Sequence, residues 1–197
     1  LHHRALSRHL PDGPSALAMD QDATLWRTPV ERIDARVGSD IAYVLFTSGS
    51  TGVPKGVMGT TSALMNRIDW MHEAYPFAHG EVACCKTSIG FVDSVWEMLG
   101  PLLAGVTTVI IPHEVVLDPE RFIAVLAQHS VSRIVLVPTL LRVLLDHAPD
   151  LGVRLPALTM WSVSGEVLTA DLVRRFRRAC PGRRLINLYG SSEVAAD

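Results

Sequence analysis

Residues 41–56 read IAYVLFTSGSTGVPKG, and this stretch decides how the rest of the chain is interpreted. Its first part, Ile41 to Phe46, is apolar and rich in strand-forming residues, which predicts a buried strand. Its second part, Thr47 to Gly56, is mostly glycine, serine and threonine, and Lys55 adds a positive charge. Small residues let backbone amide groups approach an anion closely, so the stretch predicts a phosphate-binding loop directly after a strand.

This loop departs from the common phosphate-binding loop of GTPases and ATPases. That pattern needs a glycine five residues after its first glycine, and a serine or threonine after its lysine. Here Pro54 stands five residues after Gly49, and Gly56 follows Lys55. A flexible surface linker is the alternative, but Pro54-Lys55-Gly56 behind an apolar strand is not typical of linkers. The sequence therefore favours phosphate binding by a loop of another kind.

Beyond the loop, short apolar strands alternate with amphipathic helices. The expected strands cover 57–61, 82–86, 107–111, 133–137, 158–163 and 184–188. The expected helices cover 62–75, 94–104, 119–129, 139–147 and 170–180. This alternation predicts an α/β fold with parallel-rich sheets layered with helices. Ligands usually bind at the carboxyl ends of such strands, where three loops fall: 47–56, 90–93 and 189–197.

Composition and charge exclude several classes of protein. The 197 residues are 48% hydrophobic and 19% charged, which excludes a disordered chain. A formal net charge of -2 argues against a nucleic-acid partner, and the arginines within 174–184 are interpreted as a solvated helix face. The three cysteines include no CxxC pair, which argues against a disulfide framework and indicates a reducing compartment, the cytoplasm. The eight histidines show no metal-ligand spacing, so no zinc site is expected. No apolar run reaches the ~18 residues that span a bilayer, so no membrane partner is expected.

Four motifs follow one another along the chain. They are YVLFTSGSTGVPKG at 43–56, Phe91 with SVWEM at 94–98, Gly165-Glu166, and NLYGSSE at 187–193. In type and order they resemble the motifs of the adenylate-forming, or AMP-binding, superfamily, and the last three favour its nonribosomal peptide synthetase branch. The resemblance covers 41–197 and implies the central part of the large N-terminal subdomain of an adenylation domain, with 1–40 as an irregular lead-in of the same subdomain. Because the chain begins at Leu1 and stops at Asp197, we expect a fragment that lacks the C-terminal subdomain.

The family's reaction implies what the protein does. It joins a carboxylate to ATP, gives an acyl-adenylate and pyrophosphate, and passes the acyl group to a phosphopantetheine thiol on a carrier domain. The resemblance thus implies an amino-acid-activating ligase of secondary-metabolite biosynthesis that works with ATP, Mg²⁺, a peptidyl carrier domain and neighbouring synthetase domains. Such a protein mainly positions its reactants and screens phosphate charge.

The resemblance also implies roles for individual residues. Those expected to hold the β- and γ-phosphates are Thr47, Ser48, Gly49, Ser50, Thr51, Gly52 and Lys55. Those expected to line the adenine and ribose are Gly165, Glu166, Asn187, Tyr189 and Gly190, with Tyr189 stacked on the base. Ser192 is expected to hydrogen-bond the α-phosphate, and Glu193 to bind Mg²⁺, a hard cation that prefers carboxylate and phosphate oxygens. Lys55 and Glu193 are therefore the expected catalytic residues.

Two features depart from the family's pattern. The family usually has Pro-Thr where this chain has Ser191-Ser192, but the second serine keeps a hydroxyl for the phosphate. The chain also stops before the aspartate that holds the ribose and before the catalytic lysine of the C-terminal subdomain. We therefore expect the 197 residues alone not to complete adenylation.

The residues after Phe91 carry the expectation about the substrate. In domains for α-amino acids the next residue is usually an aspartate that pairs with the α-ammonium, whereas here it is Val92 and the carboxylate follows at Asp93. A β-amino acid carries its ammonium about 1.5 Å further from its carboxylate, so the counter-charge must move with it, since an unpaired buried ammonium costs several kcal/mol. By resemblance, the pocket is lined by Val92, Asp93, Trp96, Val135, Ser162, Ser164, Leu188, Ala196 and Asp197.

This pocket series resembles that of domains that activate β-alanine, which is the expected substrate. Its chief departure is Ser162, where an isoleucine is usual. The extra hydroxyl leaves open a substituted β-amino acid such as 2,3-diaminopropionate or β-aminobutyrate. Asp197 is a second acid for the terminal ammonium.

Alternatives stay open for both the residues and the function. Asp93 or Ser94 is also a suitable helix N-cap, and SVWE at 94–97 fits a capping box, a role that can coexist with substrate binding. A stand-alone acyl- or aryl-CoA ligase has the same ATP loop, but its substrate carries no ammonium group for Asp93 and Asp197 to bind. A non-catalytic nucleotide-binding module is the third possibility, against which Lys55 and Glu193 speak.

Overall fold

A computed structural model describes residues 40–48 and 52–194 of the chain. These residues belong to one unit, Val37–Asp197. The lead-in expected over 1–40 therefore lies, apart from Asp40, outside the described residues. Among the described residues, no helix is long and apolar enough to cross a membrane.

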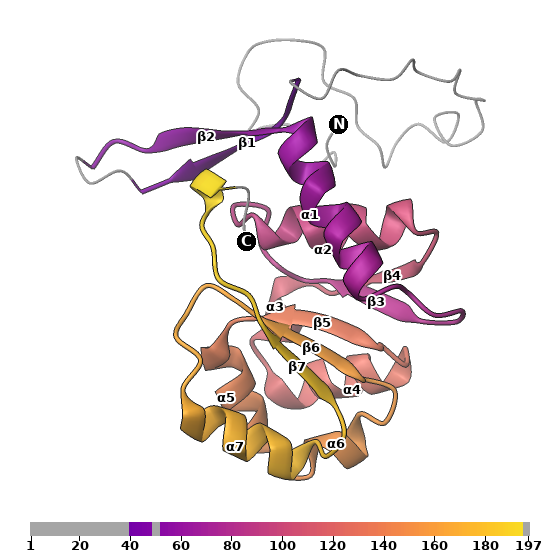
Figure 1. Cartoon of the computed structure of the whole chain (residues 1–197). Helices are drawn as coiled ribbons and strands as arrows, with labels where there is room; N and C mark the ends of the chain where they lie inside the picture. The colour runs from indigo at the N-terminus through magenta and orange to yellow at the C-terminus, as the bar shows by residue number, and fades with distance from the viewer. Residues whose placement is uncertain (1–39, 49–51, 195–197) are drawn as a thin grey trace, which may run out of the picture. The chain divides into compact units, whose positions relative to one another are not determined.

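The first two strands form an antiparallel hairpin (Figure 1), in which β1 (Ile41–Thr47) pairs with β2 (Lys55–Thr60) and Thr47 lies opposite Lys55. The expectation that the loop 47–56 follows a buried strand of a parallel sheet is therefore wrong: β1 is antiparallel, only its Leu45 is buried, and Lys55 belongs to β2. Tyr43 lies opposite Gly59, and a Cβ at Gly59 would clash with the Tyr43 ring. Glycine leaves room for the Tyr43 ring on the neighbouring strand. Because glycine has a low strand propensity, the sequence pattern does not predict this pairing.

The remaining strands are parallel, which confirms the α/β fold with parallel-rich sheets. One pair joins β3 (Val82–Cys85) to β4 (Thr107–Ile110), and the order of the other sheet is β5-β6-β7. The three strands of that sheet are β5 (Arg133–Leu136), β6 (Met160–Val163) and β7 (Arg184–Asn187). Ser132 links the two sheets, because its backbone amide donates to the Val82 carbonyl and its Oγ lies 3.1 Å from the Val82 amide nitrogen.

The helices follow the predicted order, with three short additions. The predicted ones are α1 (Thr61–Ala74), α2 (Asp93–Leu103), α4 (Pro119–Gln128), α5 (Pro138–His147) and α7 (Ala170–Ala179). The additions are α3 (His113–Val116), α6 (Leu151–Arg154) and the 3₁₀ helix η3 (Ser192–Val194). An element of three or four residues is too short to show a helical period, so the sequence pattern misses these additions.

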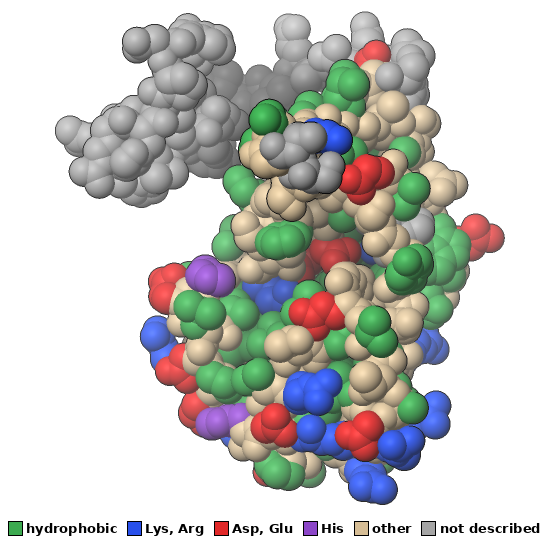
Figure 2. Space-filling view, turned by 90° about the vertical axis from the view of Figure 1, so that its left-hand side faces the viewer, with side chains coloured by type: hydrophobic (Ala, Val, Ile, Leu, Met, Phe, Trp, Pro, Cys, Tyr) green, Lys and Arg blue, Asp and Glu red, His purple; other side chains and the backbone are tan. Residues whose placement is uncertain are grey.

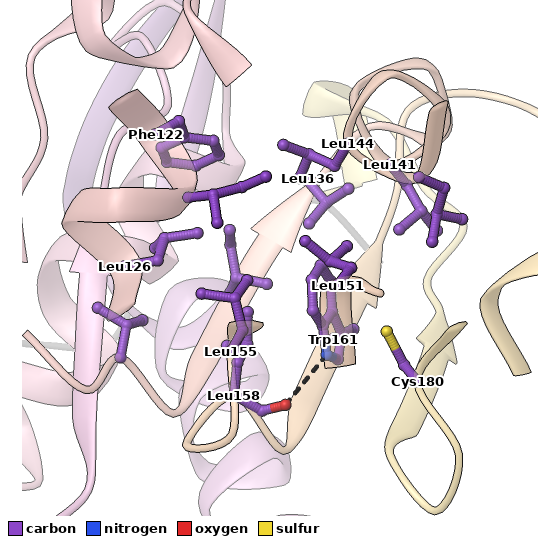
Figure 3. Packing of buried hydrophobic residues seen from close by; sticks show 14 of the residues in the cluster. Phe122, Leu126, Leu136, Leu141, Leu144, Leu151, Leu155, Leu158, Trp161 and Cys180 are labelled. Atoms are coloured by element: carbon purple, nitrogen blue, oxygen red, sulfur yellow. Dashed lines mark hydrogen bonds between the residues drawn. The ribbon is translucent and has the colours of Figure 1, made fainter. Parts of the chain in front are cut away.

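Alternation along the central strands divides the apolar residues between two faces of the sheet. Ile134 and Leu136 belong to a large core that also contains Trp161 and Phe122, whereas Val135 packs in a second cluster. Figure 3 shows the large core, where the Trp161 indole Nε1 donates a 3.2 Å hydrogen bond to a backbone carbonyl. The second cluster consists of Ile68, Met71, Trp96, Val135 and Met160. It packs α1 and α2 against the sheet, and so fixes the helices that carry the site described below.

Charged side chains of both signs lie together on the helices beneath the sheet. On α7, Arg174 pairs with Asp171 at 3.2 Å, and Arg175 pairs with Asp146 of α5. Figure 2 shows acidic and basic side chains side by side at the lower end of the view. This mixture fits the interpretation of the arginine cluster as a solvated helix face.

A second surface cluster gives a pH-dependent prediction. Glu120 of α4 accepts hydrogen bonds from Arg154 of α6 at 2.5 and 3.0 Å and from His147 of α5 at 2.8 Å. These bonds stabilise the carboxylate and lower the pKa of Glu120 from 4.5 to about 2. A lowered pKa contributes stability that is present above pH 4.5 and is lost as the pH falls toward 2.

We therefore expect Glu120→Gln to lower the melting temperature at pH 7 by a small amount, because the cluster is exposed and screened by solvent. The difference from the wild type should shrink as the pH falls from 4.5 toward 2. Thermal unfolding followed by circular dichroism at a series of pH values measures this. A difference that stays constant over the range would contradict the assignment.

Candidate functional site

Two of the three loops that the sequence singles out meet beside the parallel sheet. The turn before α2 and the segment after β7 both line a pocket of about 140 Å³. Its lining residues are Phe91, Val92, Asp93, Ser164, Gly165, Gly190, Ser191 and Ser192. Ser164 and Gly165 directly follow β6, so the pocket lies where a parallel sheet usually binds its ligand.

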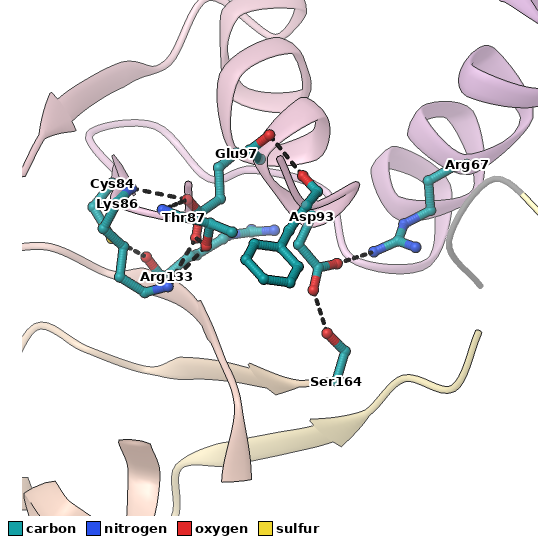
Figure 4. Close-up of polar contacts among 10 residues, drawn as sticks. Arg67, Cys84, Lys86, Thr87, Asp93, Glu97, Arg133 and Ser164 are labelled. Atoms are coloured by element: carbon teal, nitrogen blue, oxygen red, sulfur yellow. Dashed lines mark hydrogen bonds and ion pairs between the residues drawn. The ribbon is translucent and has the colours of Figure 1, made fainter. Parts of the chain in front are cut away.

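Asp93 has partners on both carboxylate oxygens (Figure 4). Its Oδ2 accepts a hydrogen bond from the Ser164 hydroxyl, and its Oδ1 lies 3.9 Å from an Arg67 guanidinium nitrogen. The Arg67 side chain is only 4% exposed, and burial lowers its pKa, while the Asp93 carboxylate acts in the opposite direction. The carboxylate that the sequence singles out is therefore held in a defined place beside the pocket.

Sequence reasoning missed Arg67 as a residue of this site. The signal was present, because Arg67 lies three residues after Leu64 and four before Met71, on the apolar side of the predicted helix 62–75. A charged residue on a buried helix face needs a partner, and Asp93 is an ion-pair partner of Arg67.

The start of α2 differs from the expected cap. The helix begins at Asp93 itself, after Val92, and the Ser94 hydroxyl donates backwards to the Phe91 carbonyl. The Glu97 side chain does not close a capping box, since it accepts hydrogen bonds from the backbone amides of Lys86 and Thr87 at 2.9 and 2.7 Å. The capping-box interpretation is therefore wrong.

Glu97 instead attaches α2 to the chain that leaves β3. Besides the two backbone amides, it accepts a 2.9 Å hydrogen bond from the Thr87 hydroxyl and forms a 3.3 Å ion pair with the Lys86 ammonium. The side chains of Lys86 and Glu97 are 6% and 1% exposed. Figure 4 shows this cluster beside Asp93, which lies one helical turn before Glu97. The buried pair thus fixes the turn of α2 that carries Asp93.

The expected substrate-pocket residues fall into three groups. Val92, Asp93 and Ser164 line the 140 Å³ pocket. Trp96, Val135 and Ser162 line a separate space of about 20 Å³, in which the side chains leave room for little more than a water molecule. Leu188 is buried and lines neither space, and Ala196 and Asp197 lie outside the described residues.

Trp96 is held by aromatic neighbours beside the second cluster. Its ring stacks on Phe77 with centroids 6.5 Å apart and lies 5.9 Å from the His72 ring. A Cβ added at Gly100, one turn further along α2, would lie 2.5 Å from two atoms of the Trp96 ring. The absence of a side chain at Gly100 therefore leaves the space that the Trp96 indole occupies.

Gly100→Ala should push the Trp96 ring out of this place, because the added methyl group overpacks a closed cluster. We expect a loss of about 1–3 kcal/mol in the free energy of unfolding. Urea denaturation followed by tryptophan fluorescence measures it. Gly90→Ala is the matched control, since the nearest atom to its added Cβ is 3.9 Å away. Equal stability of the two variants would contradict the packing role of Gly100.

A larger pocket of about 340 Å³ adjoins the first, and the two share Gly165 and Gly190. Among its lining residues are all five that the sequence assigns to the adenine and ribose: Gly165, Glu166, Asn187, Tyr189 and Gly190. Tyr189 is 93% exposed as a residue, so its ring is open to a stacking partner. Glu166 has a further task, since its Oε2 accepts hydrogen bonds from the amide and hydroxyl of Thr139 at the start of α5.

Of the expected phosphate-binding residues, Thr47, Ser48, Gly52 and Lys55 are described, and 49–51 are not. Lys55 is exposed at the start of β2, and β2 contacts η3, the helix that carries Ser192 and Glu193. The fold thus brings β2, the strand that begins at Lys55, into contact with the helix that carries the residues expected at the α-phosphate and the metal.

The donor set near Glu193 fits Mg²⁺ only together with a nucleotide. Within residues 40–48 and 52–194, no group of three or more His, Cys, Asp or Glu side chains is placed to hold a metal ion. Mg²⁺ is commonly bound through one or two carboxylates and the phosphates of its substrate, and the exposed Glu193 carboxylate suits this arrangement.

Known proteins with similar sequences belong to the same family that the motifs of this chain resemble. The family model described as AMP-binding enzyme matches residues 6–197. The chain is 42% identical over 171 residues to the beta-alanyl-bioamine nonribosomal peptide synthetase ebony of Drosophila melanogaster, which covers 82% of this chain and 20% of ebony. It is 39% identical over 158 residues to enterobactin synthase component F of Escherichia coli (strain K12), which covers 79% of this chain and 12% of that protein. The chain thus spans a fifth or less of these curated relatives.

Solved structures show the same fold. The nonribosomal peptide synthetase FmoA3 in its alpha-methyl-L-serine-AMP bound form matches with a TM-score of 0.84 and 26% identity, over 98% of this chain and 22% of that one. The adenylation domain AlmE of Vibrio cholerae, in complex with glycyl-adenosine-5'-phosphate, matches with a TM-score of 0.75 and 26% identity, over 90% of this chain and 32% of that one.

Proposed function

Since this chain belongs to the AMP-binding enzyme family, we propose that it is the ATP-binding and substrate-binding part of an amino-acid adenylation domain that activates β-alanine for nonribosomal peptide synthesis. In the proposed reaction the substrate carboxylate attacks the α-phosphorus of ATP, which gives β-alanyl-adenylate and pyrophosphate. A phosphopantetheine thiol on a carrier domain then attacks the acyl carbon, which gives a thioester and releases AMP. ATP and a reduced thiol are both available in the cytoplasm, where we expect the protein to work.

One observation carries the substrate proposal. Asp93 and Ser192 line the same 140 Å³ pocket, so the expected partner of the ammonium and the expected partner of the α-phosphate face one small space. A short amino acid fits such a space with its carboxylate toward Ser192 and its ammonium toward Asp93. Trp96, three residues after Asp93 on α2, lines the separate space of about 20 Å³, which is too small for a long side chain. The β-alanyl name of the Drosophila relative supports the same substrate.

Val92 supports a β-amino acid rather than an α-amino acid. It occupies the position directly after Phe91, where domains for α-amino acids usually have the aspartate that pairs with the ammonium. The substrate's carboxylate end is fixed by the position of the phosphate, so moving the counter-charge by one residue selects a substrate whose ammonium is displaced. The hydrogen bond from Ser164 and the ion pair with Arg67 keep Asp93 in this displaced position.

The residues of this chain act by binding and orienting. Lys55 and the hydroxyl groups of Thr47 and Ser48 are the described candidates for the β- and γ-phosphates, and Tyr189 presents an open face for the adenine. Mg²⁺, when bound, screens the phosphate charge, and Glu193 is the proposed ligand from this chain. None of these groups exchanges a proton with the substrate in the proposed reaction, in which catalysis is positioning and charge stabilisation.

The proposal is tested by trapping the activated acid. The complete protein that carries this sequence is incubated with ATP, Mg²⁺, β-alanine and hydroxylamine, and separately with coenzyme A in place of hydroxylamine. We expect β-alanyl hydroxamate and pyrophosphate in the first mixture and no β-alanyl-CoA in the second. Accumulation of an acyl-CoA would favour a stand-alone CoA ligase. ATP binding without pyrophosphate release for any carboxylic acid would favour a non-catalytic nucleotide-binding module.

A further inference from the structure

Arg67 is a buried charge whose position behind Asp93 has consequences for substrate binding. It projects from α1, its side chain is 4% exposed, and its Nη2 lies 3.9 Å from Asp93 Oδ1. It is absent from the lining of the 140 Å³ pocket, whereas Asp93 and Ser164 both line it. Figure 4 shows Asp93 with Arg67 on one side and Ser164 on another. Arg67 therefore contacts a residue of the pocket lining, Asp93, without lining the pocket itself.

Two held oxygens restrict how the Asp93 carboxylate turns. A hydrogen bond from Ser164 engages Oδ2, and the Arg67 guanidinium attracts Oδ1. Side-chain rotation that is already restricted costs no further entropy when a ligand binds, so a preorganised carboxylate binds an ammonium more tightly than a mobile one.

We propose that Arg67 is a positioning residue that holds the Asp93 carboxylate toward the pocket and thereby sets the affinity for the ammonium group of the substrate. The inference rests on the proposed function, because it concerns the same pocket. A guanidinium also reduces the negative potential at the carboxylate, which by itself would weaken ammonium binding. In the proposal the gain from orientation outweighs this effect, and the direction in which the KM for the amino acid changes in the Arg67 variants decides between the two.

The test compares variants at Arg67 in the complete protein. Arg67→Met removes the charge and keeps an apolar stem, and we expect it to raise the KM for the amino acid roughly tenfold while the KM for ATP stays within about twofold. Arg67→Lys retains a positive charge and should restore part of the affinity. Arg142→Met, at an exposed position of α5, is the control for loss of an arginine and should leave both constants unchanged.

A double variant separates positioning from a general structural effect. If Arg67 acts through Asp93, then Arg67→Met added to Asp93→Asn should produce no further rise in the KM for the amino acid. Each variant is first shown to be folded by its thermal unfolding transition, and Arg67→Gln takes the place of Arg67→Met if the latter does not fold. An unchanged or lower KM for the amino acid in a folded Arg67 variant, or additive effects in the double variant, would overturn the proposal.

The wild type is measured first with β-alanine and with the proteinogenic amino acids. If it activates one of these in preference to β-alanine, the proposed substrate is wrong, and the Arg67 variants are then measured with the preferred amino acid. If it activates no amino acid, both the proposed function and the role of Arg67 are overturned. The two proposals therefore have distinguishable failures.

Discussion

Asp93→Asn should reduce kcat/KM for β-alanine about a hundredfold or more, because the variant replaces a held carboxylate by a neutral amide opposite a buried ammonium. The amide keeps the size of the side chain and can still accept a hydrogen bond from the Ser164 hydroxyl. Loss of packing therefore contributes little, and the effect reports the missing charge, which is also an ion-pair partner of the buried Arg67. ATP–pyrophosphate exchange at varied β-alanine and fixed ATP measures it.

The KM for ATP should change by no more than about twofold, since the residues expected to bind the adenine and ribose lie in the adjoining pocket. Asp150→Asn is the matched control, because Asp150 is exposed and its side chain makes no capping hydrogen bond. A variant at Asp93 that keeps its activity with β-alanine would show that another group binds the ammonium. Equal losses in the affinities for ATP and β-alanine would point to a distorted fold.

Glu97→Ala should have the largest effect on stability, with a loss of about 3–5 kcal/mol in the free energy of unfolding. The substitution leaves the buried Lys86 ammonium without its ion-pair partner and removes the acceptor for two backbone amides. It also releases the first turns of α2 from the end of β3. Urea denaturation of the complete protein, followed through the transition that this domain contributes, measures the loss.

Glu114→Ala serves as the control, because Glu114 is an exposed carboxylate in the first turn of α3. Lys86→Met in the Glu97→Ala background should recover part of the stability, since it removes the uncompensated buried charge. Recovery remains incomplete because the amides of Lys86 and Thr87 still lack their acceptor. If Glu97→Ala is as stable as Glu114→Ala, the buried pair has no structural role.

Much of the fold is predictable because the pattern of the chain is strong in its second half. Ile134 and Leu136 are apolar neighbours of Val135 in a run typical of a strand buried on both faces, and the structure divides these residues between two clusters. Asp118 before Pro119 predicts a helix start, and the Asp118 side chain accepts hydrogen bonds from two backbone amides there. These features depend on neighbours in the sequence, which periodicity and capping rules describe.

The errors concern contacts between residues far apart in the sequence. The pairing of Thr47 with Lys55 depends on the antiparallel return of β2, which glycines make hard to foresee. Glu97 fits a local capping box by its spacing, but its carboxylate is used by the end of β3. Arg67 carries no motif of its own, and only the approach of α1 to α2 shows that it belongs with Asp93. Long-range partners of this kind are fixed by tertiary packing rather than by local pattern.

The site itself is foreseen in part. The sequence assigns Asp93, Ser164 and Ser192 to one reaction, and the structure brings all three to one pocket. The roles of these residues rest on the resemblance and remain proposals, as does the assignment of the metal to Glu193.

The most direct measurement is the ratio of kcat/KM for β-alanine to that for L-alanine in ATP–pyrophosphate exchange by the complete protein. The two acids have the same atoms and differ in the carbon that carries the ammonium, so the ratio isolates the placement of Asp93. We expect β-alanine to be preferred by about tenfold or more, because a misplaced buried ammonium leaves its counter-charge unpaired. A ratio of one or below would contradict the proposal that Asp93 selects a β-amino acid.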